Sequence, residues 1–403
     1  MLNTPFSPWP SFSEEEVEAV AAVLRSNKVN YWTGQECRAF EREFAEWAGS
    51  SHAIALGNGT LALDLALKGL GIGPGDEVVV TPRTFLASVS SVVNAGATPV
   101  FADVDRDSGN ITAETIATVL TSRTRAVIPV HLAGWPCDMD PIMALAERHD
   151  LKVIEDCAQA HGARYKGRSV GTIGHVGAWS FCQDKIITTG GEGGMVTTDD
   201  REVWSRMWSF KDHGKSWEAV YERKHPPGFR WLHESFGTNW RMTEIQAALG
   251  RIQLGRMPDW TARRETNAAI LSEALAPFAG AGGAVRLPAL SAPPERGAGS
   301  RHAYYKFYAY VVPDNLAEGW SRDRIVAEIT ARGVPCYQGS CSEVYLERAF
   351  DETPWRPEQA LPVAHELGET SLMFLVHPTL TQAEMELAAR VAADVTAAAA
   401  RRS

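Results

Sequence analysis

Seven short apolar runs occur between residues 52 and 198, and helical patterns at residues 61–70, 113–120 and 139–149 separate several of them. The runs are continuously apolar rather than alternating, which is typical of strands buried on both faces of a sheet. Strands that alternate with helices predict an α/β domain with a mainly parallel sheet. The predicted strands are His52–Leu56, Glu77–Thr81, Thr98–Ala102, Ala126–Val130, Lys152–Glu155, Gly177–Phe181 and Met195–Thr198.

The pattern changes near residue 250, and we expect two domains, residues 1–250 and 251–403. The first domain begins with helical patterns over residues 13–48 and contains the predicted parallel sheet. The second is predicted to be a smaller α/β domain, because β-like and helical stretches alternate in it. Its predicted parts are a joining helix over Thr243–Leu271, a loop over Ala279–Ser300, a β-like stretch over His302–Val312, and helices over Asp323–Arg332 and Gln382–Ala400.

Charge and composition exclude several classes of protein. The chain has 39 basic and 49 acidic residues, which argues against nucleic acid as a partner because phosphate binding requires clustered Lys and Arg. No stretch approaches the ~20 apolar residues that span a membrane. The N-terminus lacks the pattern of a secretory signal. We therefore expect a cytoplasmic protein that binds neither nucleic acid nor a membrane. The six scattered cysteines predict no disulfide framework and no metal site.

The fifth predicted strand, Lys152–Glu155, is followed directly by a carboxylate residue, Asp156. In open α/β sheets, ligands bind at the carboxyl ends of the strands. A carboxylate at such a position can pair with a cationic ligand group, such as a protonated ring nitrogen. The alternative is a helix cap for the segment that follows.

A lysine occurs shortly after the sixth predicted strand, where Gly177–Phe181 leads through Lys185 into a Thr/Gly-rich loop over residues 186–194. A lysine held in a cleft loses solvation, which lowers its pKa and makes its amine nucleophilic. A lone lysine in a loop is more often simply exposed. The residues around Lys185 decide between these interpretations.

Five short motifs occur between residues 31 and 248 and together form a specific pattern. They are YWTG at 31–34 with Phe40-Glu41, GNGTLAL at 57–63, EDCAQAHG at 155–162, Ser180-Phe181 through Lys185 to GEGG at 191–194, and NWRM at 239–242 with QAA at 246–248. In these segments, their order and their spacing, the chain resembles the DegT/DnrJ/EryC1/StrS group of aminotransferases. These are pyridoxal 5′-phosphate (PLP) enzymes of aminotransferase fold type I. The resemblance implies a large domain with a mixed, mainly parallel seven-stranded sheet, and a smaller C-terminal α/β domain.

The resemblance also implies roles for individual residues. Lys185 matches the catalytic lysine that forms the internal aldimine with PLP and moves a proton during transfer. Asp156 matches the carboxylate that keeps the pyridinium nitrogen protonated. The other implied cofactor contacts are Gly59 and Thr60 at a helix N-terminus, Ser180 beside the phosphate, Phe85 stacked on the ring, Gln159 beside the phenolic oxygen, and Asn239 reaching the phosphate from the neighbouring subunit.

The last of these contacts implies a homodimer with a shared active site. The resemblance further implies transfer of an amino group from glutamate or glutamine to a keto sugar, by an exchange in which donor and acceptor take turns. A nucleotide-linked keto-deoxyhexose is the first candidate acceptor, and a cyclitol ketone or an oxidised octulosonate is the alternative. A non-catalytic regulatory role is disfavoured, because Lys185 and Asp156 are both present and the net charge is −10.

The C-terminal third departs from the sugar-nucleotide pattern. Residues 336–343 replace a Tyr-x-Pro-Leu-His segment found in many of those enzymes, which leaves the acceptor open. Lys306, within HAYYKFYAY, either meets a substrate anion or is a solvated strand residue. His161, His213 and Arg241 are interpreted first as structural residues and second as substrate contacts.

Overall fold

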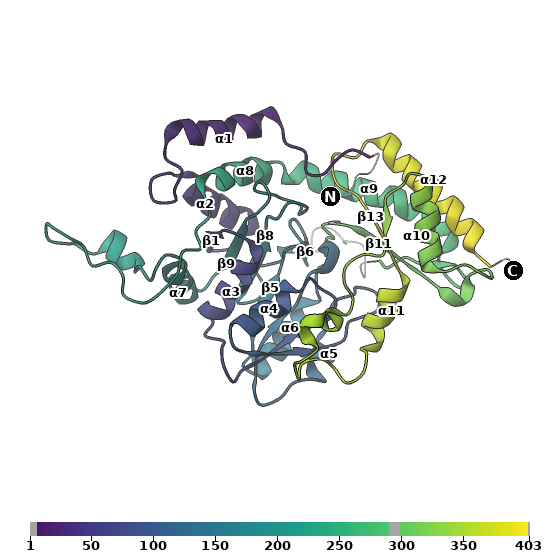
Figure 1. Ribbon diagram of the computed structural model, residues 1–403, viewed down its shortest axis with the longest axis horizontal. Helices are drawn as coiled ribbons and strands as arrows, with labels where there is room; N and C mark the ends of the chain where they lie inside the picture. Colours follow the sequence, from purple (N-terminus) through teal and green to yellow (C-terminus); the bar gives the residue numbers. More distant parts are fainter. Residues whose placement is uncertain (1–5, 290–298, 402–403) are drawn as a thin grey trace.

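The computed structural model describes residues 6–289 and 299–401 of the 403-residue chain. Its largest sheet has seven strands in the order β1-β9-β8-β5-β4-β2-β3, and only β9 runs against the others (Figure 1). The predicted mixed, mainly parallel sheet is therefore confirmed. The strands are β1 (His52–Leu56), β2 (Glu77–Val80), β3 (Thr98–Phe101), β4 (Thr124–Ile128), β5 (Lys152–Asp156), β8 (Val176–Ser180) and β9 (Gly194–Thr198).

Helices cover both faces of this sheet, which explains why its strands are continuously apolar. In β1, Ile54 packs on one face with α3 (Gly59–Gly69), α4 (Ala87–Asn94) and α7 (Arg201–Lys211). Its neighbour Ala55 packs on the other face beneath α2 (Glu36–Ala48) and α8 (Glu244–Gly255). Farther along that second face lie α5 (Ala113–Ala117) and α6 (Met139–Arg148).

Several helices begin at a residue whose side chain accepts a hydrogen bond from one of the first amide groups of the helix. Ser13 and Glu16 form the capping box of α1 (Glu14–Ser26), and Thr381 and Glu384 form that of α12 (Gln382–Ala399). Asn58 caps α3 by accepting a hydrogen bond from the amide of Leu61 at 2.9 Å. The last cap holds the turn between β1 and α3 in place, directly beside the candidate site.

A second, antiparallel sheet lies in the C-terminal part of the chain, with the order β10-β11-β13-β12. Its core is formed with α9, α10 and α12, through side chains such as Leu271, Ile325 and Val395. These elements are β10 (Val285–Arg286), β11 (Phe307–Val311), β12 (Cys336–Tyr337), β13 (Ser371–Phe374), α9 (Met257–Leu275) and α10 (Arg322–Ala331). A further helix, α11 (Pro362–Thr370), packs instead in the cluster that contains α5 and α6. A β-hairpin, β6 (Arg164–Tyr165) with β7 (Arg168–Ser169), completes the strands of the described residues.

The single joining helix predicted over Thr243–Leu271 is wrong, because two helices meet at Arg256. Pro258 lies in the first turn of α9 and has no N–H to donate to Leu254, so a continuous helix would lose that hydrogen bond. The domain boundary at residue 250 stays a prediction, since α8 spans it.

The β-like stretch predicted over His302–Val312 is only partly a strand, because β11 begins at Phe307. The preceding residues bond instead to the turn Leu132–Gly134 of the large domain. The amides of Ala303 and Tyr305 donate to the carbonyls of Gly134 and Ala133, respectively, both at 2.9 Å. Within the predicted loop over 279–300, β10 is a short strand, and residues 290–298 lie outside the described residues.

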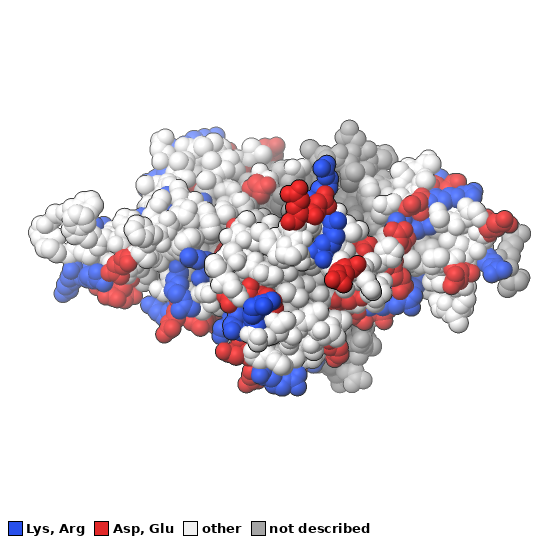
Figure 2. All heavy atoms as spheres, turned by 60° about the horizontal axis from the view of Figure 1, so that its bottom comes forward, with Lys and Arg blue, Asp and Glu red and all other residues white. Residues whose placement is uncertain are grey.

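No helix in the described ranges is long and apolar enough to cross a membrane. On the face shown in Figure 2, basic and acidic side chains are intermingled rather than gathered by sign. Ion pairs join distant segments of the chain, such as Arg106 with Glu366 and Arg286 with Asp107.

Candidate active site

A cavity of about 580 Å³ lies at the carboxyl ends of β5 and β8 and at the N-terminus of α3. This is where parallel sheets place their ligands. It brings together all but one of the site residues predicted from the sequence. Those lining it are Gly59, Thr60, Phe85, Asp156, Gln159, Ser180 and Lys185.

One end of the cavity is built to receive an anion. The first amides of α3 have no acceptor within the helix, and they carry the positive end of its dipole. Gly59 and Thr60, at the start of α3, line the cavity together with Ser180 from the end of β8. A Cβ atom on Gly59 would lie 2.5 Å from the Cβ of Ser180, so only glycine permits this close approach.

The cavity is also lined by a buried carboxylate, Asp156, at the end of β5. One oxygen accepts from the Ser88 hydroxyl at 2.8 Å, and the other accepts from the Ala158 amide at 3.1 Å. Burial raises the pKa of Asp156, although both hydrogen bonds and the charge of Lys185 oppose this shift. A cation bound beside Asp156 would relieve the cost of its burial.

Two further side chains, Gln159 and Phe85, line the cavity. The Gln159 side-chain oxygen accepts from the Ala133 amide at 2.7 Å, which leaves its NH₂ group to donate into the cavity. Phe85 is 72% exposed although it lines the cavity, so its ring offers an apolar surface on which a planar ligand can stack.

Lys185 lies at the wall of the cavity with 18% of its side chain exposed. Its Nζ is 3.4 Å from an Asp184 oxygen and 5.1 Å from the centre of the Tyr305 ring. Its backbone carbonyl accepts a hydrogen bond from the Trp9 indole at 2.9 Å. The lysine is thus contacted by its neighbour Asp184 and by two side chains from distant parts of the chain, and it lines the cavity that also contains Asp156.

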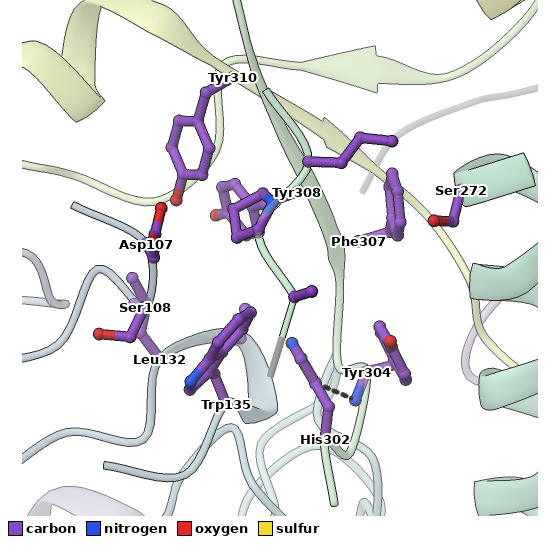
Figure 3. A pocket seen from close by; sticks show the side chains of 14 residues that line it. Asp107, Ser108, Leu132, Trp135, Ser272, His302, Tyr304, Phe307, Tyr308 and Tyr310 are labelled. Atoms are coloured by element: carbon purple, nitrogen blue, oxygen red, sulfur yellow. Dashed lines mark hydrogen bonds between the residues drawn. The ribbon is translucent and has the colours of Figure 1, made fainter. Parts of the chain in front are cut away.

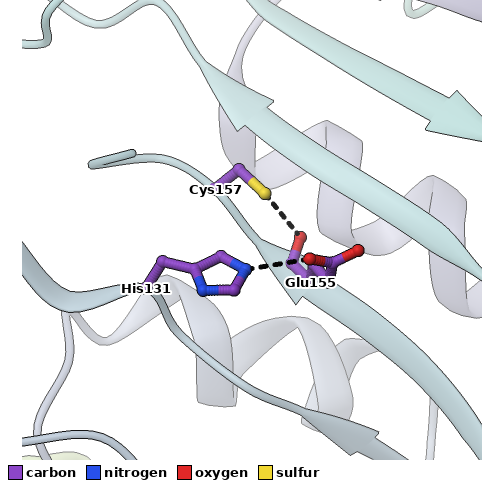
Figure 4. Close-up of side chains that lie close together, drawn as sticks. All are labelled: His131, Glu155 and Cys157. Carbon is purple, nitrogen blue, oxygen red and sulfur yellow. Dashed lines mark hydrogen bonds and ion pairs between the residues drawn. The ribbon is translucent and has the colours of Figure 1, made fainter. Parts of the chain in front are cut away.

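One buried cluster behind the cavity contains the residue types of a metal site, namely His131, Glu155 and Cys157 (Figure 4). Glu155 accepts hydrogen bonds from the amides of Gly171, Ile173 and Gly174 at 2.7–2.8 Å, and one from His131 Nε2 at 3.0 Å. Because the other nitrogen of His131 accepts from the Cys137 amide, its proton lies on Nε2. These hydrogen bonds occupy the ligand atoms of His131 and Glu155, and Cys157 Sγ donates to the Glu155 carbonyl at 3.6 Å. The cluster therefore supports the end of β5 structurally.

Replacing Glu155 by alanine is expected to lower the free energy of unfolding by about 3 kcal/mol or more, because several buried donors lose their acceptor. Burial alone would raise the pKa of Glu155, but hydrogen bonds from His131 and the amides lower it overall. This stabilisation is therefore complete above the ordinary carboxyl pKa and is lost as pH falls through the lowered value. Urea unfolding at several pH values measures both effects. The exposed Glu147→Ala variant serves as control, and equal losses in both variants would contradict the assignment.

The remaining predicted residue, Asn239, lies outside this cavity and is exposed. It lies at the base of an arm, residues 213–238, which projects from the body of the molecule in Figure 1. The arm is closed at its base by the bond from the His213 amide to the Thr238 carbonyl, at 2.8 Å. Within one chain, Asn239 therefore does not reach the residues that line the cavity.

The three less specific candidates, His161, His213 and Arg241, are not among the residues that line the cavity. His161 is fully buried between Trp179 and Phe181, and burial together with the charges of Lys185 and Arg264 lowers its pKa to about 3. Arg241 forms an ion pair with the buried Asp212 at 2.7 Å. His213 is exposed at the base of the arm and does not line the cavity.

Sequence reasoning missed three side chains that contact the site residues. Ser88 binds Asp156, Trp9 binds the Lys185 carbonyl, and the Tyr305 hydroxyl donates to Asp184. Trp9 and Tyr305 are far from Lys185 in the chain, so no local pattern could identify their contacts. Ser88 comes three residues after Phe85, about one helical turn. That spacing was the one feature of the sequence that could have placed Ser88 near the same site.

A smaller cavity of about 200 Å³ lies between the loops of the large sheet and the segment leading into β11 (Figure 3). Tyr310 and Asp107 lie on one side of it, and His302 and Tyr304 lie on the other. Neither Lys185 nor Asp156 lines it. The side chains suited to catalysis are therefore gathered in the larger cavity.

Comparison with known proteins identifies the family of this chain and several similar proteins. The model of the DegT/DnrJ/EryC1/StrS aminotransferase family matches residues 10–395. The GDP-perosamine synthase of Caulobacter vibrioides is 38% identical over 86% of this chain and 86% of its own. The dTDP-3-amino-3,4,6-trideoxy-α-D-glucose transaminase of Streptomyces venezuelae is 36% identical over 90% of this chain and 87% of its own.

A solved structure extends the likeness over almost the entire chain. The crystal structure of an aminotransferase from Psychrobacter cryohalolentis is 67% identical, with a TM-score of 0.95 over 98% of this chain and 99% of its own. The predicted fold class and the predicted aminotransferase activity are both confirmed by these comparisons.

Proposed function

We propose that this protein, which belongs to the DegT/DnrJ/EryC1/StrS aminotransferase family, transfers an amino group from glutamate or glutamine to the keto group of a nucleotide-linked keto-deoxyhexose. The names of its relatives support this acceptor class, because one makes a GDP-linked and another a dTDP-linked amino sugar. The observation that carries the proposal is the single cavity in which Lys185 and Asp156 lie together with the N-terminus of α3.

The residues of this cavity fit PLP at its phosphate end. Gly59 and Thr60 would donate their amides to the phosphate, and Ser180 would donate its hydroxyl. The absence of a side chain at position 59 keeps α3 close enough to Ser180 for both to serve one group.

The ring end of the cofactor fits the other residues of the cavity. Asp156 would face the pyridinium nitrogen, because a buried carboxylate with a raised pKa gains most from a cationic partner. Phe85 would stack on the ring, and the Gln159 amide would donate to the phenolic oxygen. When bound, PLP supplies an electron sink for the carbanion that forms at the carbon carrying the nitrogen.

The chain's own residues would then orient the reactants and move one proton. Lys185 would hold the cofactor and afterwards carry the proton between the substrate carbon and the cofactor. Asp184 and Tyr305 would orient the Lys185 amine, since both lie against it. Donor and acceptor would use the same Lys185 in turn, because one cavity contains all of these groups.

Gly59→Ala is expected to weaken PLP binding at least about tenfold, since the new methyl group would push α3 away from Ser180 and remove anchoring hydrogen bonds. Titration of the apoprotein with PLP, followed by tryptophan fluorescence, measures the affinity. Gly255→Ala is the matched control, because nothing lies within 4 Å of a Cβ at this exposed end of α8 and its backbone does not have a positive φ. An unchanged affinity in Gly59→Ala would remove this residue from the phosphate site.

We also propose that the active site is shared in a homodimer. The arm presents Phe229, Trp231 and Phe236 with exposed fractions of 77%, 80% and 102%, which is unusual for a face in contact with water. Asn239 lies at the base of this arm and outside its own cavity. An arm seated against a second copy would bury the aromatic side chains and bring Asn239 to the neighbouring phosphate site.

A mixing experiment tests the shared site. Lys185→Ala and Asn239→Ala are each expected to have little activity at limiting PLP. After the two variants are mixed and exchange subunits, some hybrid dimers contain one site with both residues intact. We expect activity to rise above the sum of the separate samples. If it does not rise while exchange is confirmed by mass spectrometry, Asn239 acts within its own chain.

The acceptor class is tested by incubating the PLP-loaded protein with glutamate or glutamine and a panel of keto compounds. The panel contains 3-keto and 4-keto deoxyhexoses linked to GDP, dTDP or UDP, a cyclitol ketone, and an oxidised octulosonate. Mass spectrometry detects the aminated product. We expect a nucleotide-linked amino sugar, and turnover of the cyclitol or the octulosonate alone would overturn the proposed acceptor.

A further inference from the structure

Three carboxylates line the cavity that contains Lys185, and no other basic side chain of the described residues lines it. The three are Asp156, Asp184 and Glu192. Negative charge therefore outweighs positive charge in the lining. The function proposed above gives roles to the first two, since Asp156 would face the ring nitrogen and Asp184 lies 3.4 Å from Lys185 Nζ. Glu192 is left without a role in this scheme.

The Glu192 side chain is exposed, and it has no strong partner. Lys185 pairs with Asp184 instead, and no ion pair in the described part of the chain involves Glu192. Its side chain contacts the Cys182 thiol, whose Sγ lies 3.9 Å from Oε1. Burial and the charge of Glu192 raise the pKa of that thiol, so it stays protonated at neutral pH. A thiol is a weak donor, so the carboxylate keeps most of its capacity to accept hydrogen bonds.

The turn that carries Glu192 has a fixed backbone, in contrast to its free side chain. The Glu192 carbonyl accepts from Thr189 Oγ1 at 2.6 Å and from Gln246 Nε2 at 2.7 Å. Gly191 has a φ of 120°, which favours glycine, and a Cβ on Gly193 would overlap the Thr189 hydroxyl. The carboxylate is therefore presented to the cavity from a defined backbone position, as a specific binding group requires.

The same turn lies against the segment that carries Lys185. Gly191 forms a parallel bridge with Cys182, and the Cys182 amide donates to Ser180 Oγ at 3.3 Å. Cys182 follows Ser180 by two residues and precedes Lys185 by three. Glu192 is thus held beside the short segment between the proposed phosphate contact and the lysine. A reactant that reaches Lys185 shares the cavity with this carboxylate.

We propose that Glu192 is a specificity-determining residue for the acceptor, whose sugar hydroxyl groups donate hydrogen bonds to its carboxylate. The inference deepens the proposed function and rests on it. Hydroxyl groups are donors, and hydrogen bonds to a charged acceptor are stronger than those between neutral groups. An acceptor that carries a carboxylate on its sugar ring would instead meet a like charge that no cation in the lining balances.

The charge of Glu192 also decides which part of the reactants suits it. The phosphates of a nucleotide and the carboxylates of the donor are anions, which a free carboxylate repels. The sugar ring of a keto-deoxyhexose is neutral and carries hydroxyl groups. The proposal therefore favours the deoxyhexose over the octulosonate, because the octulosonate is a sugar acid. The side-chain amide of glutamine is the second possible source of neutral donors.

Calorimetric titration of the PLP-loaded protein with sugar nucleotides that lack a keto group tests the proposal without turnover. The ligands are matched pairs of a hexose and its uronate, linked to UDP, dTDP or GDP, so that the members of a pair differ in one carboxylate. The variants are E192Q, which removes the charge and keeps the shape, and E192D, which keeps the charge. E147Q, at an exposed carboxylate of α6, is the control.

We expect the original protein to bind the hexose member of the tightest pair more strongly than the uronate. E192Q should reduce this preference about tenfold, whereas E192D and E147Q should retain it. An unchanged preference in E192Q, or an equal loss in E147Q, would overturn the proposal. A loss in E192Q that appears only in the response of the cofactor to glutamine would place Glu192 at the donor and overturn it too.

The visible absorbance of the bound cofactor, recorded with glutamate and glutamine on the same samples, separates this inference from the proposed function. If no pair binds while a donor changes the absorbance, the acceptor class and the role of Glu192 both fail, and the aminotransferase assignment stands. If E192Q changes the preference in a protein that no donor affects, the role of Glu192 in sugar binding stands and the proposed reaction fails.

Discussion

Lys185→Ala is expected to abolish amino transfer, with a loss of at least about 10⁴-fold in kcat, because in the proposed function this one side chain would both hold the cofactor and move the proton. The fold should persist in this variant. The two hydrogen bonds made by Lys185 involve its backbone, with the carbonyl accepting from Trp9 and the amide donating to Cys182. Alanine preserves both of them.

Three measurements check this prediction. Turnover with glutamate gives the loss of activity, thermal unfolding tests the fold, and the visible absorbance of the purified protein reports covalently bound PLP. Lys28→Ala, at an exposed lysine, is the control for removing a positive charge elsewhere. Full turnover in Lys185→Ala would show that the lysine at this cavity is not the catalytic one.

Asp156→Asn is expected to lower kcat by about 10²–10³-fold while leaving the fold intact. Asparagine has nearly the same shape and can still accept from Ser88 or from the Ala158 amide, so the loss measures the missing charge. A neutral side chain no longer stabilises a protonated ring nitrogen, and the cofactor then withdraws electrons less effectively.

The same variant is expected to melt at a higher temperature than the original protein when both are free of PLP. Burial raises the pKa of Asp156 in the folded protein, so its ionisation costs stability as pH rises through the folded value. Asparagine removes that cost. Added PLP should then stabilise the original protein more than the variant. Calorimetry with and without PLP measures the difference, and a lower melting temperature for the apo variant would contradict the role of burial.

The large sheet was predictable because its strands are buried on both faces, so each strand is continuously apolar. The break between α8 and α9 has a local signal in Pro258, but the apolar pattern continues across it. The segment before β11 could not be predicted from its β-like composition. Its backbone groups bond to Gly134 and Ala133, which lie about 170 residues earlier in the chain.

For the site, the sequence identified residues that occur within short motifs around the carboxyl ends of strands. Asp156 and Lys185 belong to this class, because Asp156 directly follows one predicted strand and Lys185 occurs shortly after another. The residues that orient them do not, since Trp9 and Tyr305 lie about 120 residues or more away from Lys185 in sequence. Such contacts arise from tertiary packing, which a single sequence does not display.

The central claim is that Lys185 and Asp156 belong to a PLP-dependent aminotransferase site. The visible absorbance of the PLP-loaded protein tests it most directly. It is recorded before and after glutamate is added, in a parallel sample with glutamine, and then after a nucleotide-linked keto sugar is added to each. We predict a yellow band that bleaches with the donor, returns with the acceptor, and is missing in Lys185→Ala. A protein that forms no such band when PLP is supplied, or a band that neither reactant changes, would contradict the account.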